Sequence, residues 1–272
     1  MHIEPLEKLS LFRRGLVLVE ISSTANTIGI KARPRIYEPL VVMGVKTKLK
    51  GVKTVVAEAA GKVDQWPPIE PSDASGENPH FDILLDTQII SIKHLFSMKT
   101  CLSFLHYFKS LSLTPSPPPK KGEAARTNDR YSIYDPTFAA RLYSETCLQK
   151  AIYDLSVTAA RGANLNPVGL NPNIRVYRYL PGTFFQKHYD DSVIDPNTKQ
   201  KSYWTLLIYI LEGTMIGGET AFCLPGSRTE IAPAVEQGMA LLHRHGHECL
   251  LHEGREVKNG VKWVLRSDVM FA

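Results

Sequence analysis

Short apolar runs separated by turn residues dominate the chain after residue 172. The run 204–211 (WTLLIYIL) is apolar on both faces, which is typical of a central strand covered on both sides. Further runs rich in β-branched and aromatic residues predict strands at 174–180, 184–190, 219–222, 238–243, 249–252 and 261–271. The last two are expected to meet at the Asn259-Gly260 turn. About eight short strands of this kind predict a double-stranded β-helix, or jelly roll, with its core at about 172–272.

The pattern before residue 172 favours helices that support such a sheet. A strand is expected at 81–85, and a helix should follow whose buried stripe is formed by Leu95, Met98, Leu102 and Leu105. Asp135 as N-cap and Pro136 at the first helical position predict a second helix. Its buried stripe is expected to consist of Phe138, Leu142, Leu148, Ile152 and Leu155. The predicted class is therefore α+β, mainly β, with a cupin-like barrel and supporting N-terminal helices.

Two stretches break this pattern. Residues 113–130 carry four closely spaced prolines, which exclude a helix or a central strand, and we expect a loop at the edge of a cavity, with a linker as the alternative. Residues 65–79 are rich in Pro, Ser, Gly and acidic residues and read as a linker or surface loop. The predicted organisation is an extension of unknown role over residues 1–79 and one domain over 80–272.

Composition narrows the function classes. The chain has 272 residues, of which 43% are hydrophobic and 22% charged, as in ordinary globular proteins. The net charge is +5, and part of the positive charge lies in two local lysine runs, at 46–53 and 120–121. This is less basic than the surface of a typical nucleic-acid-binding protein. No nucleic-acid partner is therefore expected, and the oligomeric state is left open.

Cysteine usage and the apolar runs indicate a cytoplasmic or nuclear protein. The four cysteines (Cys101, Cys147, Cys223 and Cys249) show no CxxC pairing and are expected to be free thiols. No apolar run has the roughly 18 residues that a transmembrane helix needs, and the N-terminal sequence lacks the apolar region of a secretory signal. Association with a membrane is therefore not expected.

The candidate chemistry centres on residues 179–191, YLPGTFFQKHYDD. On a strand, His188 and Asp190 would project to the same face, which gives two of the three ligands of a 2-His-1-carboxylate site. His252, at the end of an expected strand, can supply the second imidazole. Lys262 follows on a mostly apolar strand, where a buried ammonium needs an anion such as a dicarboxylate co-substrate. The alternative is that Lys262 reaches the surface or pairs with a protein carboxylate.

A second group of imidazoles competes for the metal. His243, His245 and His247 form an HxHxH motif, which on a strand would present three imidazoles on one face. Gly246 interrupts the motif at the end of an expected strand, so we interpret it as a loop at the mouth of the barrel. His252 is the preferred third ligand.

Residues 81–272 resemble the prolyl 4-hydroxylase-like 2-oxoglutarate and Fe(II)-dependent dioxygenases. The resemblance is carried by the order and spacing of several motifs. They are Tyr179 with PGxxFxxHxD, TLLIY from Thr205, GGET from Gly217, GxALLH from Gly238 and HEGxxVxxGxKWVLRSDV from His252. Lysine ten positions after the distal histidine is similar to the collagen and plant prolyl hydroxylases, whereas hypoxia-type relatives have arginine there.

The resemblance implies a set of residue roles and cofactors. His188, Asp190 and His252 would bind Fe(II), while Lys262 and the hydroxyl of Tyr179 would bind the distal carboxylate of 2-oxoglutarate. O2 would be the oxidant and ascorbate the reductant, and an unactivated C–H bond would be hydroxylated with release of succinate and CO2. The carboxylate of Asp190 argues against a halogenase, which needs that position for a halide.

The substrate stays open in the sequence. A prolyl side chain in a peptide or protein is the family's leading suggestion, and a free amino acid or small metabolite is the runner-up. From a different class, the chain could be a non-catalytic cupin-like binding module. The complete set of His188, Asp190, His252 and Lys262 speaks against that alternative, since a decayed site should lose one of them.

Overall fold

The computed structural model describes residues 66–70, 78–159 and 166–272, without the side chains of 154–159. The expectations for residues 1–65, 71–77 and 160–165 lie outside the described residues. The elements in chain order are β1 (His80–Leu85), β2 (Ile89–Lys93), α1 (Met98–Ser110), β3 (Thr114–Pro115), β4 (Asp129–Tyr134), α2 (Pro136–Ser144), α3 (Leu148–Ala159), β5 (Pro167–Leu170), β6 (Asn173–Tyr179), β7 (Phe185–His188), β8 (Lys201–Gly217), β9 (Thr220–Cys223), β10 (Glu230–Ile231), β11 (Ala240–Arg244), β12 (His252–Gly254) and β13 (Val257–Phe271).

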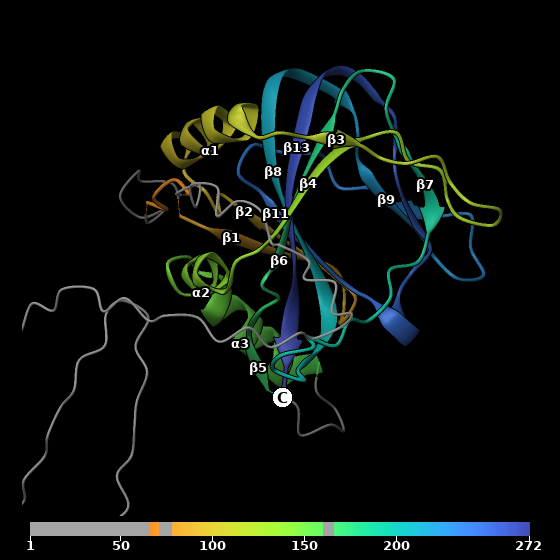
Figure 1. The fold of residues 1–272 in the computed structure, drawn as a ribbon. Coiled ribbons are helices and arrows are strands. Elements are labelled where there is room, and N and C mark those ends of the chain that lie inside the picture. Colours follow the sequence, from red (N-terminus) through yellow and green to blue (C-terminus); the bar gives the residue numbers. More distant parts are fainter. Residues whose placement is uncertain (1–65, 71–77, 160–165) are drawn as a thin grey trace, which may run out of the picture. The chain divides into compact units, whose positions relative to one another are not determined.

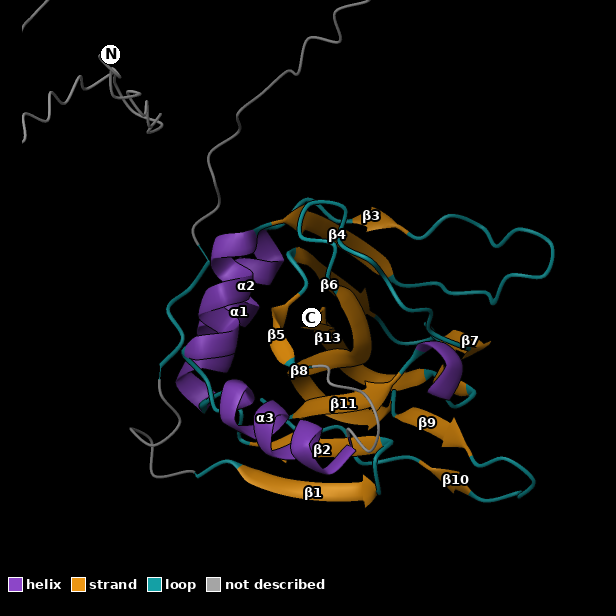
Figure 2. Ribbon diagram, turned by 90° about the horizontal axis from the view of Figure 1, so that it is seen from below, coloured by secondary structure: helices purple, strands orange, loops and turns teal. Residues whose placement is uncertain are grey.

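Two antiparallel sheets form the domain. The large sheet has nine strands in the order β1-β2-β11-β8-β13-β6-β4-β3, with β5 paired to β13, and the small sheet has the order β10-β9-β12-β7. The helices lie on one side of the large sheet and the small sheet lies on the other (Figures 1 and 2). This is the predicted double-stranded β-helix with supporting helices, and the fold class is confirmed.

Strict alternation along the central strands separates a helix-facing side from a cavity-facing side. On β8, Leu206, Ile208 and Ile210 belong to the core beneath the helices, whereas Tyr209 belongs to the core between the sheets. On β13, Trp263 and Leu265 likewise face the helices. The alternate positions Lys262, Val264 and Arg266 therefore line the cavity between the sheets.

The buried stripe predicted for the first helix is wrong at Met98 and Leu102, whereas Leu95 is buried and Leu105 packs partly buried against the core. Met98 and Leu102 are 54% and 57% exposed, and the buried apolar side chains of α1 are Cys101, Phe104 and Phe108. Ser97 caps the helix, because its hydroxyl accepts a hydrogen bond from the backbone N–H of Thr100. This start excludes Leu95 from the helix and gives the packing face to the larger aromatic residues.

The helix predicted at Asp135-Pro136 is confirmed at its start and divided further on. Asp135 caps α2 by accepting a hydrogen bond from the Phe138 N–H, with proline in the first turn. The expected single helix is two helices, α2 and α3, since α2 ends at Ser144. Phe138, Leu142, Leu148 and Ile152 are buried as expected; the Leu155 side chain is outside the described set.

Packing extends N-terminally of residue 80. The ring of Trp66 stacks on Phe138 with centroids 3.9 Å apart, and its Nε1–H donates a hydrogen bond to Asp135. Ile69 belongs to the same core. The short segment 66–70, which the sequence had assigned to the extension, therefore packs onto the helices.

One predicted turn and one predicted strand end also differ from the structure. Asn259 and Gly260 do not separate two strands: they lie inside β13, where the pairing with β8 shifts register and Gly260 has φ +78°. The connection after β12 is instead Arg255-Glu256. β7 ends at His188, so Asp190 lies just beyond the strand rather than within it.

The Pro-rich segment, residues 113–130, is mostly loop, but residues near both of its ends pair with strands. Thr114 and Pro115 pair with β4 at the edge of the large sheet, where a proline is tolerated. Farther on, Arg126 forms a β-bridge with Phe185, and the Gln186 N–H donates to the Ala125 carbonyl. The segment therefore runs along the outer edge of β7 and reaches the small sheet.

Within the described residues, no helix has both the length and the apolar character needed to cross a bilayer. All four cysteines are described, and none of them forms a disulfide bond, as predicted.

Candidate metal centre

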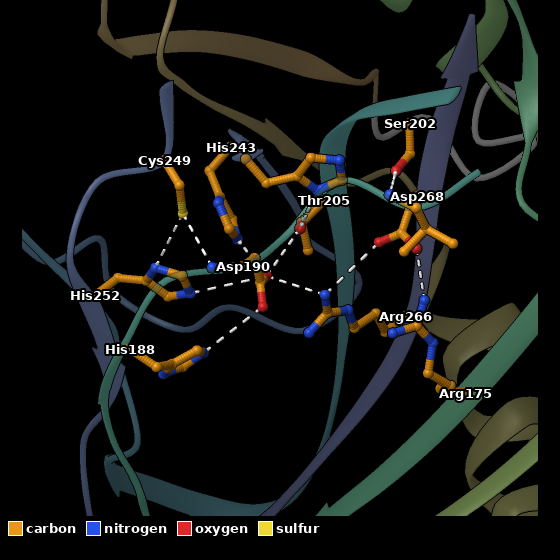
Figure 3. A network of polar contacts seen from close by, with 12 residues as sticks. Arg175, His188, Asp190, Ser202, Thr205, His243, Cys249, His252, Arg266 and Asp268 are labelled. Atoms are coloured by element: carbon orange, nitrogen blue, oxygen red, sulfur yellow. Dashed lines mark hydrogen bonds and ion pairs between the residues drawn. The ribbon is translucent and has the colours of Figure 1, made fainter. Parts of the chain in front are cut away.

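His188, Asp190 and His252 converge between the two sheets (Figure 3). His188 ends β7 and His252 begins β12, and the two are direct cross-strand partners. Backbone bonds fix Asp190 beyond the strand: its carbonyl accepts from the Gly246 N–H, and its own N–H donates to the thiol of Cys249. The small sheet thus places both imidazoles beside one buried carboxylate.

The donor atoms fit a divalent transition metal. The Nε2 of His188 lies 3.8 Å from Asp190 Oδ1, and the Nε2 of His252 lies 3.8 Å from Oδ2. The Nδ1 atoms bond to the carbonyls of Gln186 and Leu250 at 2.7 and 2.9 Å. A carbonyl only accepts, so each Nδ1 carries the proton and each Nε2 presents a lone pair toward the carboxylate. Two imidazole nitrogens and a carboxylate are the donor set of a non-heme Fe(II) site.

Asp190 is held as an oriented anion. Its Oδ2 accepts a hydrogen bond of 2.9 Å from the hydroxyl of Thr205 and an ion pair of 3.0 Å from Arg266. Burial alone would raise the pKa of Asp190, but the Arg266 charge and the surrounding imidazoles hold it well below its usual range. No described residue donates a hydrogen bond to Oδ1, which leaves that oxygen for a metal.

The imidazoles are neutral in this environment. Burial, followed by the neighbouring His252, lowers the pKa of His188 to about 4. Burial also lowers the pKa of His252, against the opposing effect of Asp190. Neutral imidazole is the form that binds metals, so the site is prepared for an ion at neutral pH.

Lys262 lies deep in the same cavity with 2% of its surface exposed. Its ammonium donates to the Gly218 carbonyl at 2.5 Å and lies 4.5 Å from the ring centroid of Tyr179, its cross-strand partner. Among the described residues, no carboxylate lies within ion-pair distance of this ammonium. Burial lowers the pKa of Lys262 to about 8 and raises that of Tyr179, whose hydroxyl stays protonated. The Lys262 ammonium is thus a buried cation that an anionic ligand would satisfy.

The cavity that joins these groups has an empty volume of about 480 Å³, its open mouth included. Phe185 lines it and stacks on His188, with ring centroids 3.6 Å apart. The guanidinium of Arg126, from the Pro-rich segment, lies 5.4 Å from the centroid of Phe185. The hydroxyls of Tyr209 and Thr220 bond to each other at 2.9 Å on another wall.

The loop interpretation of the HxHxH motif is wrong for His243, whereas His245 and His247 follow the end of β11 at Arg244. His243 lies in β11, is 1% exposed and directs its Nε2 at Asp190 Oδ2, 3.7 Å away. His245 is buried and bonds Thr205 at 3.0 Å, whereas His247 is exposed in the short 3₁₀ turn Gly246–Glu248. His243 therefore belongs to the strand and faces the site.

Arg266 was missed as a site residue. It lies four positions after Lys262 on β13, and period-two alternation puts both on the cavity face. That spacing was visible in KWVLR, but the identity of its partner was not. Arg266 also contacts Asp268, which in turn pairs with Arg175 at 2.5 Å, so a chain of buried charges supports Asp190.

Comparison with known proteins gives fold neighbours only. No family model matches the sequence, and no curated protein is significantly similar to it. The viral collagen prolyl hydroxylase of Paramecium Bursaria Chlorella virus-1 is 20% identical, over 67% of this chain and 96% of that chain, with a TM-score of 0.46. A Pseudomonas putida prolyl-4-hydroxylase is 15% identical, over 67% and 92%, with a TM-score of 0.48.

A third neighbour is a Trichoplax adhaerens prolyl hydroxylase in complex with a hypoxia inducible factor peptide fragment. It is 13% identical over 68% of this chain and 84% of that chain, with a TM-score of 0.49. At these identities and TM-scores the similarity carries no argument about activity. The assignment of a function therefore rests on the residues of this chain.

Proposed function

We propose that the chain is an Fe(II)- and 2-oxoglutarate-dependent dioxygenase that hydroxylates an unactivated C–H bond and releases succinate and CO2. One observation carries the proposal: a buried lysine, Lys262, with no described carboxylate within ion-pair distance of its ammonium, lines the same cavity as His188, Asp190 and His252. A metal chelator that also carries a distant carboxylate would satisfy both features at once. 2-Oxoglutarate is such a molecule.

Each residue has a definite task in this proposal. His188, Asp190 and His252 would hold Fe(II), which when bound supplies the activation of O2. The ammonium of Lys262 and the protonated hydroxyl of Tyr179 would bind the distal carboxylate of the co-substrate. Arg266 and Thr205 keep Asp190 ionised and oriented. The apolar walls, Phe185 and Val264 among them, exclude water from the reacting groups.

The substrate belongs to the proposal as well. A prolyl side chain in a peptide or protein is our first candidate. Arg126 gives specific support to the runner-up, a free amino acid or small metabolite, because its guanidinium lines the cavity and pairs with no carboxylate in the described part of the chain. A substrate that bears its own carboxylate would supply that partner. Ascorbate is proposed only as the reductant.

Succinate formation tests the reaction. Chelator-treated protein reconstituted with Fe(II), ascorbate and 2-oxoglutarate should produce succinate, and products heavier by one oxygen should appear in mass spectra of peptide and metabolite mixtures. Asp190→Ala should abolish both signals. A binding module would instead keep its partner after Asp190→Ala, and the proposal fails if the wild type produces no succinate and binds neither Fe(II) nor 2-oxoglutarate.

A further inference from the structure

His245 is a buried side chain to which the proposed function gives no task. It is 3% exposed, and it follows directly after β11. Its backbone N–H donates to the Tyr203 carbonyl at 3.1 Å, which continues the pairing of β11 with β8 by one residue. The next backbone N–H, that of Gly246, donates to the Asp190 carbonyl at 2.8 Å. Residues 245–246 therefore connect a central strand to the residue that carries the carboxylate of the candidate metal centre.

The hydroxyl of Thr205 joins the imidazole of His245 to that carboxylate (Figure 3). Its Oγ1 lies 2.9 Å from Asp190 Oδ2 and 3.0 Å from Nδ1 of His245. Asp190 is ionised, so its oxygens only accept hydrogen bonds. A hydroxyl has one hydrogen, and Thr205 donates it to the carboxylate, so Nδ1 of His245 has to be the donor in the other bond. The hydrogen bonds therefore run from His245 through Thr205 to Asp190.

The other nitrogen of His245 supports this order. Nε2 is buried and has no hydrogen-bond partner among the described residues. If Nε2 carried the only proton, a buried N–H would be unpaired, and the bare Nδ1 would compete with Asp190 for the single hydrogen of Thr205. With the proton on Nδ1, both bonds of Thr205 are satisfied. The unpaired Nε2 also means that the known contacts of this imidazole concentrate on Thr205.

We infer that His245 is a positioning residue of the metal centre. Its N–H fixes the direction of the Thr205 hydroxyl, which would otherwise rotate about its C–O bond. Thr205 and Arg266 then occupy Oδ2 of Asp190, at 2.9 and 3.0 Å, and leave Oδ1, 3.8 Å from Nε2 of His188, for the ion. The inference rests on the metal centre of the proposed function and not on its co-substrate or reaction.

The order of the hydrogen bonds can be tested without any metal. Nitrogen-15 NMR of the histidine rings in chelator-treated, full-length protein reports which ring nitrogen carries a proton, and the spectrum of His245→Asn identifies the signals of this ring. Nδ1 of His245 should be protonated. A bare Nδ1 would overturn the inference, because His245 could not then donate to Thr205.

Metal affinity tests the positioning role, with Mn(II) as the probe and calorimetry as the measurement. His245→Phe keeps a ring and removes the donor, so it should bind Mn(II) about tenfold more weakly, as expected when an outer hydrogen-bond partner of a ligand is lost. His245→Asn can offer an amide N–H near the place of Nδ1 and should stay closer to the wild type than His245→Phe does. Equal losses in the two variants would show that the ring only fills space.

A double-mutant cycle shows whether His245 acts through Thr205. Thr205→Val removes the hydroxyl, so adding His245→Phe to it should weaken Mn(II) binding no further, whereas independent effects would add. Additive losses would overturn the inference. His245→Leu replaces the Phe variant if circular dichroism shows that the latter is unfolded.

His247→Gln is the matched control, because it removes the exposed histidine of the same motif and should leave the affinity for Mn(II) unchanged. If the wild type binds Mn(II) and His245→Phe binds it equally well, the inference fails and the proposed function stands. If the wild type binds no Mn(II), the proposed function fails, and the NMR result decides whether His245 orients Asp190.

Discussion

At the scale of single residues, the buried ammonium of Lys262 destabilises the folded protein, so the stability of the fold does not explain its presence. Burial lowers its pKa from 10.5 to about 8, which means that the folded protein holds the ammonium at a cost. A ligand anion would offset that cost, so binding and stability should oppose each other at this position.

Lys262→Met should therefore stabilise the ligand-free protein by roughly 1–3 kcal/mol at pH 7. This range already includes the loss of the hydrogen bond from the ammonium to the Gly218 carbonyl. The same variant should lose 2-oxoglutarate binding. Because the folded-state pKa lies below the unfolded one, the penalty is complete below pH 8 and disappears as pH rises to about 10.5. Chemical denaturation at several pH values checks this; a stability gain that is constant up to pH 10.5 would contradict it.

Arg266 has the opposite relation to stability. It pairs with Asp190 at 3.0 Å and contacts Asp268, and both carboxylates are buried. Arg266→Met would leave them without this cation, so the free energy of unfolding should fall by about 3–5 kcal/mol. Arg255→Met is the control, because the Arg255–Glu230 pair is exposed and its loss should cost less than about 1 kcal/mol. If urea denaturation shows the same loss of unfolding free energy in both variants, Arg266 does not stabilise the two buried carboxylates.

At the scale of the elements, the sequence predicted where strands and helices form better than it predicted which side of a helix is buried. The strands β1, β6 and β11 and the start of α2 lie close to their predicted positions, and β8 contains the predicted strand 204–211 but extends from Lys201 to Gly217. The buried face of α1 was predicted wrongly, because Met98 and Leu102 fit the helical period as well as Cys101 and Phe104 do. Only the contact with the sheet selects between two such stripes, and periodicity contains no information about that contact.

A pair of substitutions in α1 tests the corrected face. Phe104→Ala should destabilise the fold by about 3–5 kcal/mol, because its ring is fully buried against Phe96 and Phe108. Met98→Ala, at an exposed position of the same helix, should change stability by less than about 0.5 kcal/mol. Thermal unfolding followed by circular dichroism would contradict the assignment if the two variants lost the same amount.

At the scale of the whole domain, the site joins both sheets. His188 and His252 come from β7 and β12 of the small sheet, whereas Lys262 and Arg266 come from β13 of the large one. The sequence indicated His188, Asp190, His252 and Lys262 through local motifs. His243 and Arg266 depend on how β11 and β13 face the small sheet, and pairing across such distances cannot be read from the local pattern.

Ligands that bind between the sheets should stabilise the fold as a unit. Fe(II) or Mn(II) at about 100 times its dissociation constant should add roughly 2.7 kcal/mol to the free energy of unfolding. A chelator should reverse this increase in the free energy of unfolding, and His188→Ala should reduce the increase. Differential scanning fluorimetry with and without metal measures this, and an identical shift in His188→Ala would place the binding elsewhere.

The segment that runs along β7 has a consequence for how a peptide could approach. β7 is an edge strand of the small sheet, and Ala125 and Thr127 already bond to the backbone groups of Gln186 and Phe184 at its beginning. An unpaired edge next to a reactive centre would invite strand addition, either by a substrate or by another misfolded chain. Here the beginning of that edge is already paired, so a peptide substrate of the proposed hydroxylase would have to cross the mouth of the barrel and present one side chain inward.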